Sequence, residues 1–469
     1  MKCIAAVLFF LLPFLATAQE GYEIKVTLKP FKNQYVYLGH YYGKQLPIID
    51  SVKLNNESTA VFKGAKKLGG GVYLVGFPDR SRHFEILIDK TQRFSIFADT
   101  ARIDNITFTG SPENTAFAQY QTFMNGHGRA LDALMKQRQA APADSVQLTE
   151  KMATEQAAIK GYRNGIITKE PTSLLALLLK MMKDPDVPKT ATKDSLFAYN
   201  YFKSHYWDGI NFYDDRLVRT PVFEPKLDKY FEQLVYPDAD SVNRELDWML
   251  GYASASVEMQ KFLLIKFINR YLNQKYMWED AVFVHLYDAY ISGKTYPWLN
   301  EEGKKVITDR AYSLMANIMG HPASDIELPD TAGKKTTLYN VKAPYTLVAI
   351  WDPTCGHCKE VIPRIDSIYT ARWKGMGLKL FGMAKETEGT RDTWLQFIRE
   401  HKLSAWTHVY YSKAADKARI DAGIPGYSQL YDVQSFPTLY LLDGEKRIIA
   451  KKVTESQVDE ILAIKQKQH

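Results

Sequence analysis

The chain has 469 residues, of which 46% are hydrophobic and 24% are charged, and these proportions are ordinary for folded globular proteins. This length exceeds what one hydrophobic core usually serves and suggests about three domains. The formal net charge of +7 is spread along the chain without a basic tail or stripe, so nucleic-acid binding is not expected.

Residues 1–18 have the pattern of a secretory signal peptide. A basic start precedes an apolar run from Ile4 to Leu15, and the small residues Ala16 to Ala18 follow it. We therefore expect cleavage before Gln19 and export to the periplasm. The run is short for a stable membrane span, which needs roughly 20 apolar residues, and no later segment reaches that length. An uncleaved N-terminal anchor, associated with a membrane, is the alternative. Cys3 precedes the run, so the mature chain is expected to contain two cysteines.

Eight short segments in the first part of the mature chain have the composition of β-strands. They are rich in Val, Ile, Tyr and Phe and are separated by Pro, Gly, Asn and Asp. The expected strands are Tyr22–Leu28, Gln34–Tyr42, Ile48–Leu54, Thr59–Phe62, Val72–Phe77, Phe84–Asp89, Phe94–Ala98 and Ile106–Thr109. The pattern predicts an all-β sandwich or barrel over residues 19–110.

A helical period begins at Ser111-Pro112 and continues to about residue 320. The expected helices are Glu113–Gln139, Ala143–Glu170, Thr172–Lys183, Lys193–Trp207, Glu224–Tyr236, Asp238–Tyr271, Met277–Ser292 and Asn300–Met319. Several breaks coincide with prolines, which remove a helical hydrogen bond. We expect the aromatic residues between Tyr199 and Tyr213 to pack between helices, with partner recognition as the alternative.

Strands and helices alternate over residues 321–469. The expected strands are Tyr345–Trp351, Leu378–Met383, Thr407–Tyr411, Thr438–Leu442 and Arg447–Ala450, and the expected helices are Gly356–Trp373, Arg391–His401 and Glu455–Lys465. Such alternation predicts an α/β sheet with helices on both faces. The sequence as a whole therefore predicts a multidomain protein with an all-β domain, an α-helical middle region and a C-terminal α/β domain.

The two cysteines of the mature chain, Cys355 and Cys358, open a predicted helix directly after a predicted strand. Their spacing places both sulfurs on one helical turn. The first sulfur lies near unpaired backbone N–H groups and the positive helix end, which favours a thiolate at Cys355. Cys358 lies one turn inside the helix and is expected to be more buried and to resolve a mixed disulfide. The pair is thus expected to carry out thiol-disulfide exchange.

Two other uses of the pair are less compatible with the sequence. Zinc needs four ligands, but the chain has no second CxxC or HxxxH, and His401 and His408 lack the spacing of metal ligands. A purely structural disulfide would close a very short loop and therefore stabilise the fold little. We expect neither a metal nor a cofactor.

The segment Trp351-Asp352-Pro353-Thr354-Cys355-Gly356-His357-Cys358 resembles the active site of the thioredoxin superfamily. Within that superfamily, residues 321–467 are most similar to the secreted TlpA/ResA-like thiol-disulfide oxidoreductases. Trp351, Pro363 and Phe436-Pro437-Thr438 also match the family pattern. The resemblance implies a thioredoxin-like fold, an attacking Cys355, and a cis Pro437 that faces the pair and holds the substrate backbone.

Gly356 and His357 form the dipeptide that protein disulfide isomerase carries between its cysteines. A histidine at this place stabilises the thiolate of Cys355 and makes the pair more oxidising. The β and helical regions upstream are similar to regions found ahead of thioredoxin-like domains in bacterial envelope proteins. The similarity includes short sequence segments such as Phe108-Thr109-Gly110-Ser111-Pro112.

Two family acids are missing from this chain. Ala349 stands where thioredoxin has a buried acid, and Val361 stands where ResA-like proteins have a glutamate. Lys385 and Glu386 follow a strand expected to end at Met383, and we interpret them as part of a solvated charged loop.

The sequence therefore predicts a periplasmic thiol-disulfide oxidoreductase that exchanges disulfides with client proteins and with an unidentified redox partner. One alternative is an envelope ligand- or partner-binding protein whose thioredoxin-like domain is accessory. Another is a peroxiredoxin-like peroxidase, which requires a threonine where this chain has Asp352.

Overall fold

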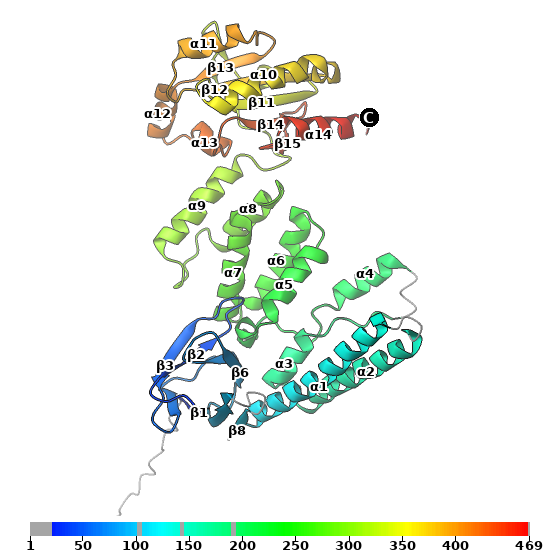
Figure 1. Cartoon of the computed structure of the whole chain (residues 1–469). Coiled ribbons are helices and arrows are strands. Elements are labelled where there is room, and N and C mark those ends of the chain that lie inside the picture. Colours follow the sequence, from blue (N-terminus) through cyan, green and yellow to red (C-terminus); the bar gives the residue numbers. More distant parts are fainter. Residues whose placement is uncertain (1–20, 101–105, 141–144, 189–193, 468–469) are drawn as a thin grey trace, which may run out of the picture. The chain divides into compact units, whose positions relative to one another are not determined.

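The computed structural model describes residues 21–100, 106–140, 145–188 and 194–467 (Figure 1). The expected signal peptide, residues 1–18, lies outside this part. By packing, the chain divides into two compact units, Met1–Val235 with Trp248–Phe262, and Tyr236–Asp247 with Leu263–His469. The three-domain division stays a prediction. Across the described ranges, no helix combines the length and the apolar character that a membrane crossing needs.

The first unit begins with two four-stranded sheets. One has the strand order β4-β1-β7-β8, with β1 and β7 parallel, and the other has the order β3-β2-β5-β6. The strands are β1 Tyr22–Lys29, β2 Tyr35–His40, β3 Ile48–Lys53, β4 Thr59–Gly64, β5 Gly71–Gly76, β6 His83–Ile88, β7 Arg93–Asp99 and β8 Thr107–Thr109. Every expected strand of this region is present.

A single hydrophobic core lies between these sheets. Alternate residues of β1, namely Ile24, Val26 and Leu28, point into it and are fully buried, as the period of two in a strand requires. Val36 and Leu38 of β2 enter the same core from the other sheet. Of the two expected architectures, the sandwich is therefore the one that forms.

Helices follow the sandwich, as predicted. They are α1 Pro112–Ala140, α2 Ser145–Lys169, α3 Leu174–Met181, α4 Ser195–Ser204, α5 Phe223–Gln233, α6 Ala239–Ala253, α7 Val257–Leu272, α8 Glu279–Tyr290 and α9 Glu301–Met315. The expectation of one helix over Asp238–Tyr271 is wrong, because α6 and α7 are separate. Ser256 accepts the N–H of Met259 (3.3 Å) and Ser254 donates to the Gly251 carbonyl (2.6 Å), so serine side chains replace the helical bonds at the break.

The C-terminal part of the second unit is an α/β fold around the sheet β13-β12-β11-β14-β15 (Figure 1). Its elements are β9 Leu328–Pro329, β10 Lys335–Thr336, β11 Tyr345–Trp351, α10 Gly356–Ala371, β12 Leu378–Lys385, α11 Arg391–Glu400, β13 Thr407–Tyr411, α12 Lys413–Asp421, α13 Tyr427–Leu430, β14 Thr438–Leu442, β15 Ile448–Lys451 and α14 Glu455–Lys467. Strands β11, β12 and β13 are parallel, whereas β14 and β15 are antiparallel. This arrangement is a thioredoxin-like fold, so the expected fold class is confirmed.

Two hydrophobic cores cover the two faces of this sheet. Helices α10, α11 and α14 pack on one face, and the segment before β11 packs with α13 on the other. Strand β11 lies between both cores, and Thr346 to Trp351 are all buried. The end of β11 and the start of α10 are thereby held by packing on both sides.

Several features of this part differ from the prediction, including the short elements β9, β10 and α13, which were not expected. Helix α12 was not expected, because its sequence is charged and none of its side chains is buried, so it carries no apolar period. Strand β12 runs two residues beyond Met383, and Lys385 is its last residue. Lys385 is only 5% exposed, so the interpretation of this lysine as part of a solvated loop is wrong.

Candidate active site

Cys355 lies at the N-cap of α10, where its backbone is still extended. Its N–H donates to the Asp352 carbonyl (3.2 Å), and its own carbonyl accepts the N–H of Lys359 (3.1 Å). The first amide groups of a helix lack partners within the helix and form the positive end of the helix dipole. None of them donates a capping hydrogen bond to the Cys355 side chain. Its side chain is partly exposed, whereas Gly356 and His357 of the first turn are exposed.

Cys358 lies one turn into α10 and is fully buried. Burial raises the pKa of its thiol to about 12, and the charges of Cys355 and Asp352 add to the rise, while a hydrogen bond from the Asp352 backbone opposes it. Both cysteines are free thiols. The pair therefore combines one accessible sulfur with one that stays protonated at neutral pH.

The segment Phe436-Pro437 lies opposite the pair. The Sγ of Cys355 is 3.9 Å from the Phe436 carbonyl oxygen, and the peptide bond between Phe436 and Pro437 is cis. Both side chains are partly exposed, and β14 begins at the next residue. A partly exposed segment thus lies beside the accessible sulfur.

Trp351 belongs to the core beneath this site rather than to its surface. Its side chain is fully buried and packs against Phe397, with 5.0 Å between the ring centroids. Ala349 is also buried, as is Val361 at 3% exposure, so both positions of the missing acids are apolar packing positions.

Asp352 is an acid whose burial and hydrogen bonds the sequence did not predict. It is 5% exposed, and one carboxylate oxygen accepts both the N–H and the hydroxyl of Thr354 (2.7 Å each). The other oxygen accepts the hydroxyl of Thr387. These bonds fix the loop between β11 and α10. Thr387 is remote in sequence, and only the Asp-Pro turn could have suggested this acid.

The described residues form no cluster of three or more His, Cys, Asp or Glu side chains that could hold a metal ion. His408 is buried instead, and its Nε2 lies 2.8 Å from the Leu403 carbonyl.

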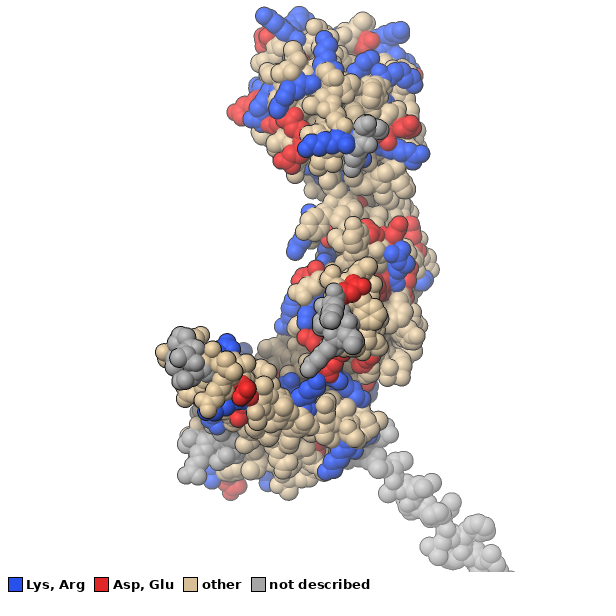
Figure 2. Space-filling model, turned by 90° about the vertical axis from the view of Figure 1, so that its right-hand side faces the viewer, with Lys and Arg blue, Asp and Glu red and all other residues tan. Residues whose placement is uncertain are grey.

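On the face in view, Figure 2 shows Lys and Arg side chains interspersed with Asp and Glu over the C-terminal part.

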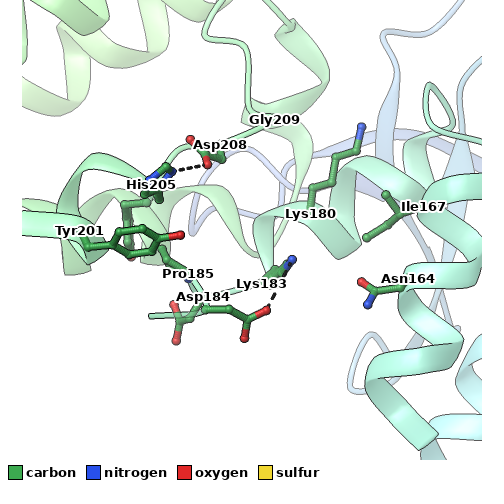
Figure 3. A pocket seen from close by; sticks show the side chains of 12 residues that line it. Asn164, Ile167, Lys180, Lys183, Asp184, Pro185, Tyr201, His205, Asp208 and Gly209 are labelled. Atoms are coloured by element: carbon green, nitrogen blue, oxygen red, sulfur yellow. Dashed lines mark hydrogen bonds and ion pairs between the residues drawn. The ribbon is translucent and has the colours of Figure 1, made fainter. Parts of the chain in front are cut away.

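A cavity of about 400 Å³ lies among the helices of the first unit (Figure 3). His205 Nδ1 is 2.7 Å from Asp208 Oδ2 there, and Lys183 Nζ is 3.8 Å from Asp186 Oδ2. Its lining includes Asn164, Lys180, Asp184 and Tyr201. Several of its polar side chains are thus paired with one another, and neither cysteine lies in its wall.

Two family models match parts of the chain, and both are described as domains of unknown function. DUF4369 matches residues 22–117, and DUF5106 matches residues 137–317. A comparison with curated proteins finds no match.

Several solved structures are similar to the chain. A domain of a possible thiol-disulfide isomerase from Cytophaga hutchinsonii is 29% identical, with a TM-score of 0.28, over 32% of this chain and 94% of that one. A thioredoxin-like protein from Bacteroides caccae is 21% identical, with a TM-score of 0.40, over 60% of this chain and 98% of that one. The thioredoxin domain of a thiol-disulfide oxidoreductase from Bacteroides vulgatus is 25% identical, with a TM-score of 0.26, over 31% of this chain and 97% of that one. At these TM-scores, the fold of the C-terminal part is assigned from its own strand order and helices.

Proposed function

We propose that the chain is a periplasmic thiol-disulfide oxidoreductase that exchanges disulfides with client proteins through Cys355 and Cys358. The observation that carries this proposal is the difference between the two sulfurs. Cys355 is partly exposed at the N-cap of α10, beside the Phe436 carbonyl, and Cys358 is buried one turn further on. Thiol-disulfide exchange needs one accessible thiolate and one nearby thiol that waits for the mixed disulfide.

In the reducing direction, the Cys355 thiolate attacks one sulfur of a client disulfide. The client S–S bond breaks, and its second sulfur leaves as a thiolate that takes up a proton. Cys358 then gives up its proton and attacks the Cys355 sulfur, which releases the remaining client thiol. The client gains two electrons and two protons, and the pair becomes a disulfide that a redox partner must reduce. Oxidation of client thiols is the same sequence in reverse.

The test is insulin reduction with dithiothreitol as the electron donor. We expect the Cys355→Ser variant to lose turnover, because no accessible thiolate remains, and the Cys358→Ser variant to accumulate covalent client complexes. A Cys355→Ser variant with full activity would overturn the proposal. Consumption of hydrogen peroxide at a comparable rate would favour the peroxidase alternative.

We propose that the pair is more oxidising than thioredoxin and so favours the oxidation of client thiols. The reason is His357, which lies exposed between the two cysteines. A histidine next to the thiolate is expected to stabilise the reduced pair, so we expect a potential above the thioredoxin value of about −270 mV. Redox titration against glutathione measures it, and a potential at or below that value would contradict this direction.

The periplasmic location and the mature start at Gln19 are tested by cell fractionation and N-terminal sequencing of the exported protein. The binding-module alternative has a specific candidate in the cavity of Figure 3. A full chain with both cysteines replaced by serine would keep its specific partner under that alternative and would lose its client proteins under the proposed function.

A further inference from the structure

Lys385 is a buried lysine of the thioredoxin-like part that thiol-disulfide exchange does not require. Its Nζ lies 2.8 Å from the Asp416 carboxylate and 4.8 Å from the ring centroids of both Tyr411 and Tyr427. The lysine side chain is 7% exposed and the aspartate side chain is 19% exposed. The ammonium group is thus enclosed by one carboxylate and two aromatic faces.

An enclosed ammonium group is stable only if its charge is compensated. The carboxylate supplies the opposite charge, and the faces of two tyrosine rings add a cation–π attraction. Removal of the ammonium group would leave the Asp416 carboxylate without its cation and Tyr427 without the group that its ring faces. Lys385 therefore fixes Asp416 in α12 and Tyr427 in α13 at the same time.

The neighbouring Glu386 adds a second attachment of α12. Its carboxylate accepts the N–H of Lys413, the first residue of that helix (3.1 Å). Lys385, the last residue of β12, and Glu386, which follows it, thus hold a helix that has no fully buried side chain of its own.

Tyr427 connects this group to the cysteine pair. Its ring stacks on Phe436, with 6.3 Å between centroids and 16° between planes. Phe436 packs against the hydrophobic cores on both faces of the sheet, and its carbonyl oxygen is 3.9 Å from the Cys355 sulfur. A continuous series of contacts therefore leads from Lys385 through Tyr427 and Phe436 to Cys355.

We propose that Lys385 is a positioning residue for the binding of protein clients, acting through Tyr427 on the segment Phe436-Pro437. This inference rests on the proposed function. Because the Phe436 carbonyl lies 3.9 Å from the Cys355 sulfur, we expect a client protein whose disulfide reaches Cys355 to contact this segment, whereas a small disulfide needs only the sulfur. Displacement of the segment should therefore weaken the binding of protein clients and leave the reaction with small disulfides largely unchanged.

The experiment compares insulin with glutathione disulfide as substrates of the reduced full chain. For Lys385→Met, which keeps the aliphatic stem, we expect kcat/KM for insulin to fall roughly tenfold, mainly through KM, and the rate with glutathione disulfide to change by less than about twofold. Lys385→Arg, which keeps the cation, should restore most of the insulin activity. Lys417→Met is the matched control. Lys417 forms an exposed ion pair with Asp421 on α12, the helix that also carries Asp416, so this variant should leave both rates unchanged.

A fall of equal size for both substrates, or no fall for insulin, would overturn the inference. If Lys385→Met does not fold, Tyr427→Leu decides the question, since it removes the ring contact with Phe436 and leaves the ion pair in place; the same selective loss is expected. Reduction of neither substrate by the unsubstituted chain would contradict the proposed function itself, so the two failures are distinguishable.

Discussion

The two cysteine side chains differ most in how far they are exposed to water. Burial raises the pKa of Cys358 to about 12, so this thiol stays protonated at neutral pH. Cys355 is partly exposed at the helix start. Within the proposed mechanism, only Cys355 can therefore begin the exchange, and Cys358 reacts once a mixed disulfide lies next to it.

Alkylation of Cys358 by iodoacetamide, in the Cys355→Ser variant, should keep accelerating through pH 10 without a plateau. The reason is burial, which remains after the substitution and keeps the thiolate population at pH 8 roughly a thousandfold below that of an ordinary thiol. Mass spectrometry of the modified site gives the rate at each pH. A plateau below about pH 9.5 would show that the thiol is not shielded as the structure indicates. The Cys358→Ser variant gives the alkylation rate of Cys355 for comparison.

At the scale of elements, strands β12 and β13 hold a histidine with very little space around it. His408 pairs with Gly382 in the register of the two strands, and its Nε2–H donates to the Leu403 carbonyl (2.8 Å). A Cβ at Gly382 would lie 2.9 Å from the Nδ1 atom, so this glycine makes room for the ring. Burial lowers the pKa of His408 to about 4, which means that the folded domain holds a neutral imidazole.

The stability of the C-terminal part should therefore decrease as the pH falls from about 6.5 to 4. An unfolded histidine takes up a proton near pH 6.5, whereas His408 resists protonation until about pH 4, so its contribution is complete above the unfolded pKa and is lost below it. The expected loss from this one group is about 3 kcal/mol. Urea unfolding at pH 7 and pH 4 measures it.

Comparison with variants isolates this effect from the carboxylates that titrate in the same range. His408→Gln should be less stable at pH 7 because it loses the stacking on Trp406, but its stability should change less between the two pH values. His401→Gln removes an exposed imidazole from the end of α11 and should keep the full pH dependence. Equal slopes for all three chains would contradict the assignment.

The elements themselves were largely predictable from the sequence, because alternating or helical apolar patterns reflect the face that each element buries. All eight strands of the sandwich and the strand-turn-helix around Cys355 follow from such patterns. Helix α12 has no apolar face, and the break between α6 and α7 depends on two serine hydrogen bonds, so neither produces that signal. The burial of Lys385 and Asp352 could not be predicted either, since their partners Asp416 and Thr387 lie 31 and 35 residues away.

At the scale of the molecule, the second unit joins helix α8 and the residues that follow α9 to the edge strand β15. Lys451 of β15 is 3% exposed, and its ammonium group donates to the Asp280 carboxylate of α8 and to the carbonyl and side-chain oxygens of Asn317 (2.6 and 2.8 Å). These three acceptors match the three donors of an ammonium group. Burial lowers the pKa of Lys451, and the charge of Asp280 opposes that change.

The Asp280→Ala variant should therefore destabilise the thioredoxin-like part, although residue 280 lies outside the segment expected to form it. Removal of one partner leaves a buried cation without its counter-charge, which costs about 3–5 kcal/mol. Urea unfolding followed by tryptophan fluorescence measures the loss. The exposed pair Lys305–Asp309 of α9 is the matched control, and Asp309→Ala should cost less than about 1 kcal/mol.

Addition of Lys451→Met to the Asp280→Ala variant separates the ion pair from the lost packing of the side chain. If the unpaired cation is the main cost, the double variant should regain most of the stability, because no buried charge remains without a partner. Additive losses would mean instead that the two side chains stabilise the unit independently. Recovery would establish that the buried ammonium group of Lys451, once it lacks Asp280, is what destabilises the unit that carries Cys355, so that this unit depends on a residue well outside the cysteine motif.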